Sequence, residues 1–349
     1  MTRIVSRITD FFSHRSSDAS PKEEPSEIAL KGRPPPAVAV DNLSALLARP
    51  RLAPDWRPLA VSVHDRRYRE MRRAHHYFGE VVAEVTGAPP VRMLCHDDDI
   101  VAYVYFFFGQ DSYEPLSLRL FAGFAEDGGA VLDIGAYTGL FGLVAAATNP
   151  AATVTGFEPF SHVAARARLN IALNGLSNLK LEGKAISDRS GSAALTLYGG
   201  SSATTGASLA KKARSDIGVL EVEVTQVDDV ASDLPAPVRL MKIDTEGDEP
   251  AAMKGAAETL ASAGPVVLSE VLSDDAVRAQ CAQMFAHGYR AWFISERARR
   301  LIPVDENFSL DGRGYGNLIF LRGAEDAARA EALTAEFREL DFVAPAAGR

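Results

Sequence analysis

The stretch that most constrains the fold of this chain is VLDIGAYTGLFG, residues 131–142. An apolar run containing Asp133 leads into a turn with Gly135 and Gly139, and a second apolar run follows. This pattern is typical of a buried strand, a tight turn and a buried helix. In α/β sheets such a turn lies outside the carboxyl end of a strand, where ligands bind. The stretch therefore predicts a βα unit whose turn holds a ligand.

The pattern of strand followed by helix continues along the chain. We predict strands over 130–134, 153–158 and 179–186, with helices over 139–148 and 161–173. After two further strands around a Ser/Thr/Gly-rich loop at 199–208, we predict a strand over 238–244, a helix over 249–264, and strands over 265–271, 289–296 and 316–322. Successive βα units imply a parallel sheet with right-handed crossovers. The predicted fold class is α/β, with a mainly parallel sheet and helices on both faces.

The regions outside this core have different patterns. Residues 1–37 read as an amphipathic start and a disordered linker, and it stays open whether residues 1–14 contact a membrane surface peripherally or fray. Residues 38–125 read as an extension, helical from about 40 to 84, followed by a hairpin of two β-rich pieces on either side of Asp97, Asp98 and Asp99. Residues 324–349 read as a terminal helix and tail.

Composition narrows the classes of partner and the compartment. The formal net charge of -9 argues against nucleic acid, because binding a polyphosphate needs a basic face. The two cysteines lack the spacing of a zinc site. We find no apolar run of about 18 residues and no signal-peptide pattern. We therefore expect a cytoplasmic protein, with peripheral contact to the inner membrane face as the open question for residues 1–14.

The turn at 135–139 favours an adenosine ligand without pyrophosphate. Its glycines do not match the dinucleotide fingerprint, and the bulky Tyr137 disfavours a closely bound pyrophosphate. Glu158 ends the second predicted strand, about 20 residues after the glycines, where a carboxylate can accept both ribose hydroxyls. The expected ligand therefore contains adenosine.

The charge of the predicted strand ends indicates which adenosine compound binds. Asp133, Glu158, Asp244 and Glu270 all fall at predicted strand ends, so they crowd one edge of the sheet with negative charge. This edge repels pyrophosphate and attracts a sulfonium with a nearby ammonium group. The expected cofactor is S-adenosyl-L-methionine.

Several short motifs resemble one enzyme family when they are taken together. They are YEP at 113–115, VLDIGAYTGLFG, GFEP at 156–159, AISDRSG at 185–191, LMKIDTEGDE at 240–249 and GNLIFL at 316–321. In order and spacing they resemble the FkbM family of S-adenosylmethionine-dependent methyltransferases, with the domain itself over 126–323. The resemblance implies a Rossmann-like class I methyltransferase fold with a seven-stranded sheet. It also implies O-methylation of a hydroxyl on a sugar, glycan or natural product. Tyr137 departs from the family, which usually carries Asn there.

The candidate site residues divide by role. The predicted cofactor-binding residues are Asp133, Gly135, Tyr137, Gly139, Glu158 and, by resemblance, Asp188 near the adenine edge. His162 is a further candidate contact on the adenine side. For catalysis we predict that Asp244 lines the reaction centre as proton acceptor, with Glu246 as second choice and Lys242 pointing the other way. Asp248 and Glu249 are expected to be first-turn acids that stabilise a helix.

Three alternatives stay open at the level of the sequence. The acidic DTEGDE stretch invites a metal site, but its spacing fits no standard cation loop, so we predict no metal ion. A nicotinamide-dependent oxidoreductase shares the general fold, although the glycine spacing and the acidic edge disfavour it. A catalytically silent, methyltransferase-like scaffold is suggested by Tyr137.

Overall fold

The computed structural model describes residues 42, 44–46, 70, 72–197, 207–208, 218–311 and 315–339. All of them belong to one unit, residues 40–349, so the amphipathic start and linker predicted over 1–37 lie outside the described residues. No helix of the described part is long and apolar enough to cross a bilayer.

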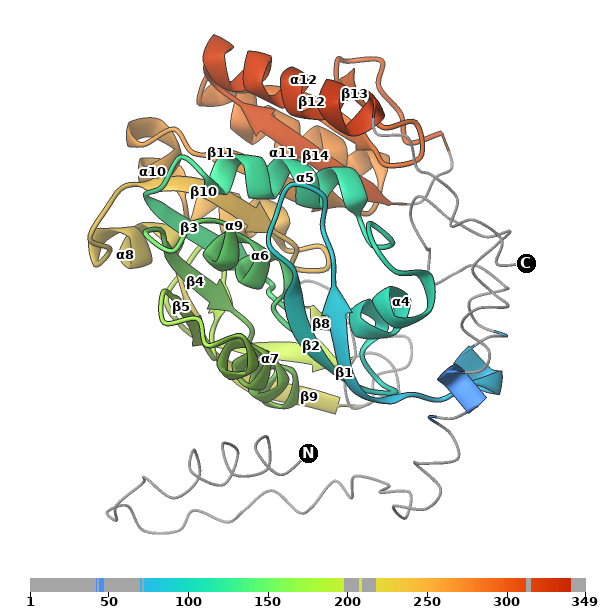
Figure 1. Cartoon of the computed structure of the whole chain (residues 1–349). Coiled ribbons are helices and arrows are strands. Elements are labelled where there is room, and N and C mark those ends of the chain that lie inside the picture. Colours follow the sequence, from blue (N-terminus) through green and yellow to red (C-terminus); the bar gives the residue numbers. More distant parts are fainter. Residues whose placement is uncertain are drawn as a thin grey trace. The chain divides into compact units, whose positions relative to one another are not determined.

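The main sheet has eight strands in the order β13-β12-β14-β11-β10-β3-β4-β5 (Figure 1). They are β3 (Ala130–Ile134), β4 (Thr153–Phe157), β5 (Leu179–Glu182), β10 (Val238–Ile243), β11 (Val266–Val271), β12 (Arg290–Ser295), β13 (Arg300–Pro303) and β14 (Gly316–Leu321). Strands β11, β10, β3, β4 and β5 are parallel, whereas β14, β12 and β13 pair antiparallel. The mainly parallel sheet is confirmed. The sequence did not predict β13, which adds an eighth strand at one edge.

Helices cover both faces of this sheet, as predicted (Figure 1). One face carries α5 (Pro115–Ala125), α6 (Leu140–Thr148), α7 (Ser161–Asn174) and α12 (Ala324–Glu339), and the other carries α8 (Val227–Ser232), α9 (Glu249–Lys254), α10 (Ala257–Ser262) and α11 (Asp274–Ala286). Alternation along the strands fills two separate cores: Val131 packs on the α5 and α6 side, and Leu132 packs on the α9 and α11 side. Both faces of β3 are buried, which explains its continuous apolar sequence.

The extension before the core differs from its prediction. Residues 78–83, predicted as helical, form strand β1 (Phe78–Ala83), which pairs antiparallel with β2 (Val91–His96). The second predicted β piece is the helix α4 (Ile100–Phe108). Asp99 caps this helix by accepting from Val101 N at 2.9 Å and Ala102 N at 3.1 Å. Residues 100–107 are all buried, so their unbroken apolar run reflects a helix that is enclosed on every side.

Two predicted elements are interrupted near the site. The strand predicted over 179–186 divides into β5 and β6 (Ala185–Ile186), and the helix predicted over 249–264 divides into α9 and α10. The helix is interrupted where Gly255 passes the chain after β6, since a β-carbon on Gly255 would lie 2.1 Å from the Ser187 carbonyl oxygen.

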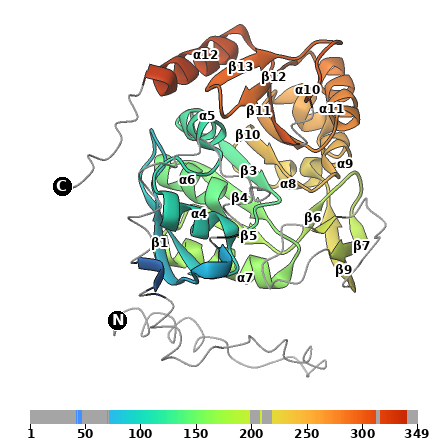
Figure 2. The ribbon, with the colours of Figure 1, turned by 90° about the vertical axis from the view of Figure 1, so that its right-hand side faces the viewer.

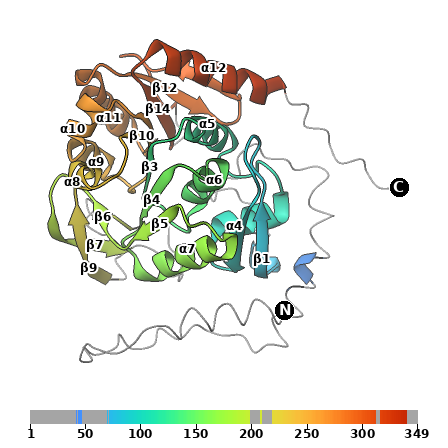
Figure 3. The ribbon, with the colours of Figure 1, turned by 60° about the vertical axis from the view of Figure 1, so that its left-hand side comes forward.

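A small second sheet occupies the crossover between β5 and β10. Strand β6 joins β7 (Gly191–Leu197), β8 (Ala207–Ser208) and β9 (Gly218–Thr225) in the order β6-β9-β7-β8, seen at the lower right of Figure 2. The strand predicted after the Ser/Thr/Gly-rich loop, VLEVEVTQVDD at 219–229, ends at Thr225, because residues 227–232 form α8. Figure 3 shows this sheet below α8 and α9, on the opposite side of the main sheet from α5 and α6.

Candidate active site

The turn after β3 is held against two neighbouring strands. Gly135 N and Ala136 N both donate to the Phe157 carbonyl oxygen at the end of β4, at 3.0 and 2.9 Å. Gly135 has φ 76°, and a β-carbon there would lie 1.7 Å from the carbonyl oxygen of Asp244, which follows β10. Gly139, with φ 96°, precedes the first residue of α6. The glycines are therefore required by close approach and by left-handed backbone.

Asp133 stabilises this turn from inside the protein. Its side chain is buried, and its Oδ2 accepts from Gly142 N at 2.8 Å, in the first turn of α6. Burial raises the pKa of Asp133 to about 6, although Lys242 and the Gly142 amide act to lower it. Asp133 therefore holds the start of α6 against the end of β3. Direct contact with the cofactor stays a prediction.

Glu158 lies beside the turn, directly after β4. Its Oε2 accepts from Tyr137 N at 3.1 Å and its Oε1 accepts from Phe160 N at 2.8 Å. Burial raises the pKa of Glu158 to about 8, and the two amides lower it less than burial raises it. Each carboxylate oxygen accepts one amide, so each keeps a lone pair for a ligand.

Tyr137 has a left-handed backbone, with φ 49°. Asn tolerates this conformation better than most residues, whereas other side chains incur a strain of about 1–2 kcal/mol. The Asn that the related family usually carries at this position therefore has a backbone explanation. The side chain of Tyr137 packs against the core that contains α4 and α6.

The predicted direction of Lys242 is wrong. Its Nζ lies 2.5 Å from Asp244 Oδ2, because residues two apart on a strand point to the same face. The side chain is buried and its ammonium lies 4.6 Å from the centre of the Phe141 ring. Burial alone would lower the pKa of Lys242, but the carboxylates of Asp244, Glu114 and Asp133 raise it above its ordinary value. The site thus contains a buried, charged lysine.

The loop after β10 gathers acidic side chains. Glu249 Oε1 accepts from Thr245 N and Gly247 N, both at 2.9 Å, so Glu249 stabilises the loop that leads into α9. Asp248 is the N-cap of this helix, but its side chain makes no capping hydrogen bond. Glu246 has a left-handed backbone, with φ 57°.

Glu270 in β11 faces this loop. Its carboxyl oxygen lies within 4.8 Å of those of Asp244 and Glu249. Burial raises the pKa of Glu270 well above its ordinary value, and the charges of Asp244 and Glu246 add to the effect. The predicted proton acceptor Asp244 therefore lies in a group of carboxylates contributed by two strands and a helix.

Sequence reasoning missed the contacts that connect the extension to this site. Asn317 Nδ2 in β14 donates to Glu114 Oε2 at 3.0 Å, joining the YEP and GNLIFL motifs. Glu296 accepts from Leu116 N at 2.7 Å and Ser117 N at 3.1 Å, so a distant carboxylate caps α5. Burial raises the pKa of Glu296 to about 7. The only sequence signal for the contact between Asn317 and Glu114 was that both motifs belong to one family resemblance. Glu296 lies in neither motif.

Two predicted cofactor contacts lie to one side of the turn. The carboxylate of Asp188, after β6, pairs with Lys254 at 2.8 Å, and this pairing lowers the pKa of Asp188. Its described hydrogen bonds do not reach the turn at 135–139. His162 is exposed in the first turn of α7, with its ring 5.7 Å from that of Phe160. Their roles at the adenine stay predictions.

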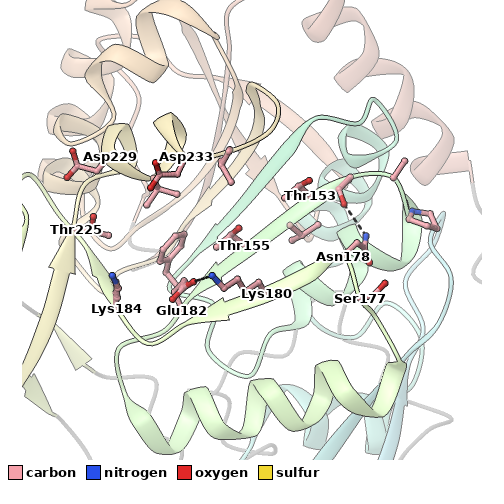
Figure 4. Close-up of a pocket in the computed structure, with 17 residues that line it drawn as sticks. Thr153, Thr155, Ser177, Asn178, Lys180, Glu182, Lys184, Thr225, Asp229 and Asp233 are labelled. Atoms are coloured by element: carbon pink, nitrogen blue, oxygen red, sulfur yellow. Dashed lines mark hydrogen bonds and ion pairs between the residues drawn. The ribbon is translucent and has the colours of Figure 1, made fainter.

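A groove of about 660 Å³ lies elsewhere, on the α8 side of β4 and β5 (Figure 4). Thr153 and Thr155 of β4 line it together with Lys180 of β5, Asp229 of α8 and Asp233 directly after α8. It forms because the chain between β5 and β10 builds the small sheet and the short α8. None of the predicted site residues lines this groove.

The fold is the Rossmann-like α/β fold of class I methyltransferases. Three features define it: the strand order, the helices on both faces of the sheet, and the acidic, glycine-containing turn at the carboxyl ends of the parallel strands. Residues 133–301 match the methyltransferase FkbM domain. The predicted family and the predicted enzyme class, a methyltransferase, are confirmed.

Solved methyltransferase structures are similar to this chain at low sequence identity. A SAM-dependent methyltransferase from Agrobacterium tumefaciens has 14% identity over 76% of this chain and 81% of its own, with a TM-score of 0.39. Methyltransferase FkbM from Methylobacillus flagellatus KT has 15% identity over 56% of this chain and 44% of its own, with a TM-score of 0.35. Precorrin-6y C5,15-methyltransferase from Geobacter metallireducens GS-15 has 14% identity over 60% of this chain and 87% of its own, with a TM-score of 0.37. No curated protein sequence matches this chain significantly.

Proposed function

We propose that this chain transfers a methyl group from S-adenosyl-L-methionine to a hydroxyl group of an acceptor molecule. The observation that carries the proposal is the position of Glu158. Its carboxylate is held by the amides of Tyr137 and Phe160 beside a glycine turn, at the carboxyl end of the sheet. A methyltransferase domain that includes all these residues is the context.

The residues of this edge fit the proposed cofactor in shape and charge. The lone pairs that Glu158 keeps can accept the two ribose hydroxyls. A β-carbon built on Gly139 would meet Ala167 at 3.6 Å, an ordinary van der Waals contact, so the left-handed backbone is what requires a glycine there. Carboxylates outnumber cations here, which favours a ligand with a sulfonium and an ammonium group. When bound, the cofactor supplies a methyl carbon that the sulfonium activates.

Asp244 is the residue that we assign as proton acceptor for the methylated hydroxyl. Lys242 occupies its Oδ2, which leaves Oδ1 to accept the proton as the hydroxyl oxygen attacks the methyl carbon. Glu246, two residues later on the same loop, is the second candidate. Most of the rate enhancement would come from holding the acceptor oxygen close to the methyl carbon and in line with it.

The acceptor class that we propose is a sugar, glycan or natural-product hydroxyl, as the family resemblance implies. A site lined by carboxylates suits a ligand rich in hydroxyl donors. The same charge disfavours nucleic acid as the acceptor.

Calorimetric titration of the full chain with S-adenosyl-L-methionine and with NAD tests the cofactor. Transfer of a labelled methyl group to a panel of sugars and hydroxylated natural products tests the reaction. We expect saturable binding of the methyl donor, no binding of NAD, and transfer to at least one member of the panel. Binding of NAD alone would establish the oxidoreductase alternative. Binding of the donor, with no transfer to any compound of the panel, would support the silent scaffold.

A further inference from the structure

Three carboxylates from separate elements meet beside the proposed proton acceptor. Asp244 follows β10, Glu249 begins α9, and Glu270 lies in β11. One oxygen from each lies within 4.8 Å of the other two. The adjacent parallel strands β10 and β11 bring Asp244 and Glu270 to the same edge of the sheet.

Two of these carboxylates have a buried oxygen that has no hydrogen-bond partner among the described residues. Glu249 has no exposed surface; its Oε1 holds the loop at 245–247, and its Oε2 has no hydrogen-bond partner among the described residues. Glu270 Oε2 is likewise buried and without a partner in the described part of the chain. Buried polar atoms are almost always paired, so two orphaned oxygens on carboxylates of the same cluster indicate a missing ligand.

Charge indicates that the ligand is a cation. Among the described ion pairs, only the pair between Lys242 and Asp244 includes one of the three carboxylates. One ammonium cannot compensate three carboxylates at this separation. We place the proposed donor over the turn at 135–139 and Glu158, and we assign the orphaned oxygens of Glu249 and Glu270 to a second ligand.

The geometry fits a small divalent ion with oxygen ligands. At a metal–oxygen distance of about 2.1 Å, ligand oxygens of an octahedral ion lie about 3.0 Å apart when adjacent and about 4.2 Å apart when opposite. The 4.8 Å limit of the cluster is close to that range, so small side-chain rotations would close it around an ion. Three protein oxygens leave about three positions for water or an acceptor hydroxyl.

We propose that Asp244, Glu249 and Glu270 bind one divalent cation of the Mg²⁺ or Mn²⁺ type. This proposal departs from the expectation of no metal, which considered the DTEGDE stretch alone and did not combine it with Glu270 of the next strand. The ion-binding site stands on its own geometry. Its chemical role rests on the proposed function: an acceptor hydroxyl that coordinates the ion would lose its proton more readily. Glu246, the second candidate, would then accept this proton, because the oxygen of Asp244 that Lys242 leaves free would bind the ion.

Mn²⁺ binding to the full chain tests the site, measured by electron paramagnetic resonance of free and bound Mn²⁺ without any methyl donor. We expect one Mn²⁺ per chain, displaced by excess Mg²⁺. Glu270→Gln should raise the dissociation constant at least tenfold. Glu258→Gln removes the same charge from an exposed carboxylate of α10 and should leave the constant unchanged. Asp244→Asn provides a second test if Glu270→Gln does not fold, as judged by circular dichroism.

The outcomes separate this site from the proposed function. Absence of Mn²⁺ binding up to millimolar concentration would overturn the site, and so would binding that Glu270→Gln and Asp244→Asn both leave unchanged. Titration of the same samples with S-adenosyl-L-methionine reports on the cofactor. If the chain binds the donor but not Mn²⁺, the metal-site proposal fails and the methyltransferase proposal stands. If it binds Mn²⁺ but not the donor, the metal site stands and the proposed function fails.

Discussion

The backbone of Gly135 passes so close to Asp244 that a β-carbon on the glycine would lie 1.7 Å from the Asp244 carbonyl oxygen. The turn proposed to hold the methyl donor and the loop that carries the proposed proton acceptor are therefore in direct backbone contact. A change in one displaces the other.

Gly135→Ala should disrupt both halves of the site. The new methyl group must push the β10 loop away, so we expect a loss of about 3 kcal/mol or more in the free energy of unfolding and no measurable donor binding. Urea denaturation and calorimetric titration measure the two effects. Gly175→Ala is the matched control, since Gly175 also has positive φ, at 65°, but no atom lies within 4 Å of a β-carbon there. The control should lose only about 1 kcal/mol, and equal losses in the two variants would contradict the close contact.

Donor affinity should depend on the charge of Glu158. Glu158 can accept one ribose hydroxyl on each oxygen when it is ionised, whereas protonation turns one oxygen into a donor, and burial raises its pKa to about 8. The association constant should therefore rise roughly tenfold between pH 7 and pH 9, as the ionised fraction increases. Titration calorimetry across this range measures the profile. Glu158→Gln should bind the donor more weakly and lose this slope, and a flat profile for the unmodified protein would argue against the ribose contact.

Stability without ligand should fall as pH rises through the same range. The folded state keeps the proton on Glu158 up to about pH 8, whereas the unfolded chain releases it near 4.5. The contribution of this retained proton to the free energy of unfolding is therefore complete below pH 4.5, and it is lost as pH rises to about 8. Between pH 7 and pH 8.5, the ionisation of Glu158 alone should lower the free energy of unfolding by on the order of 1 kcal/mol. Urea denaturation at the two pH values should show a smaller loss for Glu158→Gln than for the unmodified chain, and identical losses would contradict the raised pKa.

The local parts of the site were predictable from sequence because short-range physical rules determine them. A buried strand followed by Gly135 and Gly139 produces a tight turn whatever the rest of the chain does. The position of Glu158 follows from the next βα unit. The helix α4 was missed because a nine-residue apolar run has no period that separates strand from helix, and the capping role of Asp99 was read as a hairpin turn.

The long-range contacts could not be read from local patterns. The carboxylate of Glu296 caps a helix 180 residues earlier in the chain, and Glu270 meets Glu249 only because β10 and β11 are neighbours. Sequence spacing holds no record of which strands pair. The direction of Lys242 was predictable, because strand alternation places it on the side of Asp244.

Glu296→Ala should loosen α5 from the sheet. The substitution leaves the amides of Leu116 and Ser117 without an acceptor at the start of a buried helix, so we expect a loss of about 2 kcal/mol. Urea denaturation measures the loss, and hydrogen exchange should show faster exchange of the α5 amides. Glu126→Ala removes a carboxylate directly after the same helix, but its side chain is 52% exposed and its partner Arg329 also pairs with Asp127. That control should cost under about 1 kcal/mol, and equal costs would show that Glu296 does not hold α5.

Lys242→Met should destabilise the protein in a manner that depends on pH. Lys242 is the buried cation beside Asp244, and without it this carboxylate faces Glu114 and Asp133 with no compensating charge. Removing one partner of a buried ion pair costs about 3–5 kcal/mol. The ionised carboxylates are then disfavoured in the folded state, so protonation at lower pH should restore part of the stability.

The comparison with a surface lysine makes this prediction specific to the buried site. Lys254 pairs with Asp188 at 2.8 Å, but its side chain is 70% exposed, so Lys254→Met should cost under about 1 kcal/mol at any pH. Urea denaturation of both variants at pH 5 and pH 8 measures the difference. The cost of Lys242→Met should be larger at pH 8 than at pH 5, because fewer carboxylates need compensation under acidic conditions. A cost that is the same at both pH values would mean that Lys242 contributes packing against Phe141 and no charge to the acidic edge.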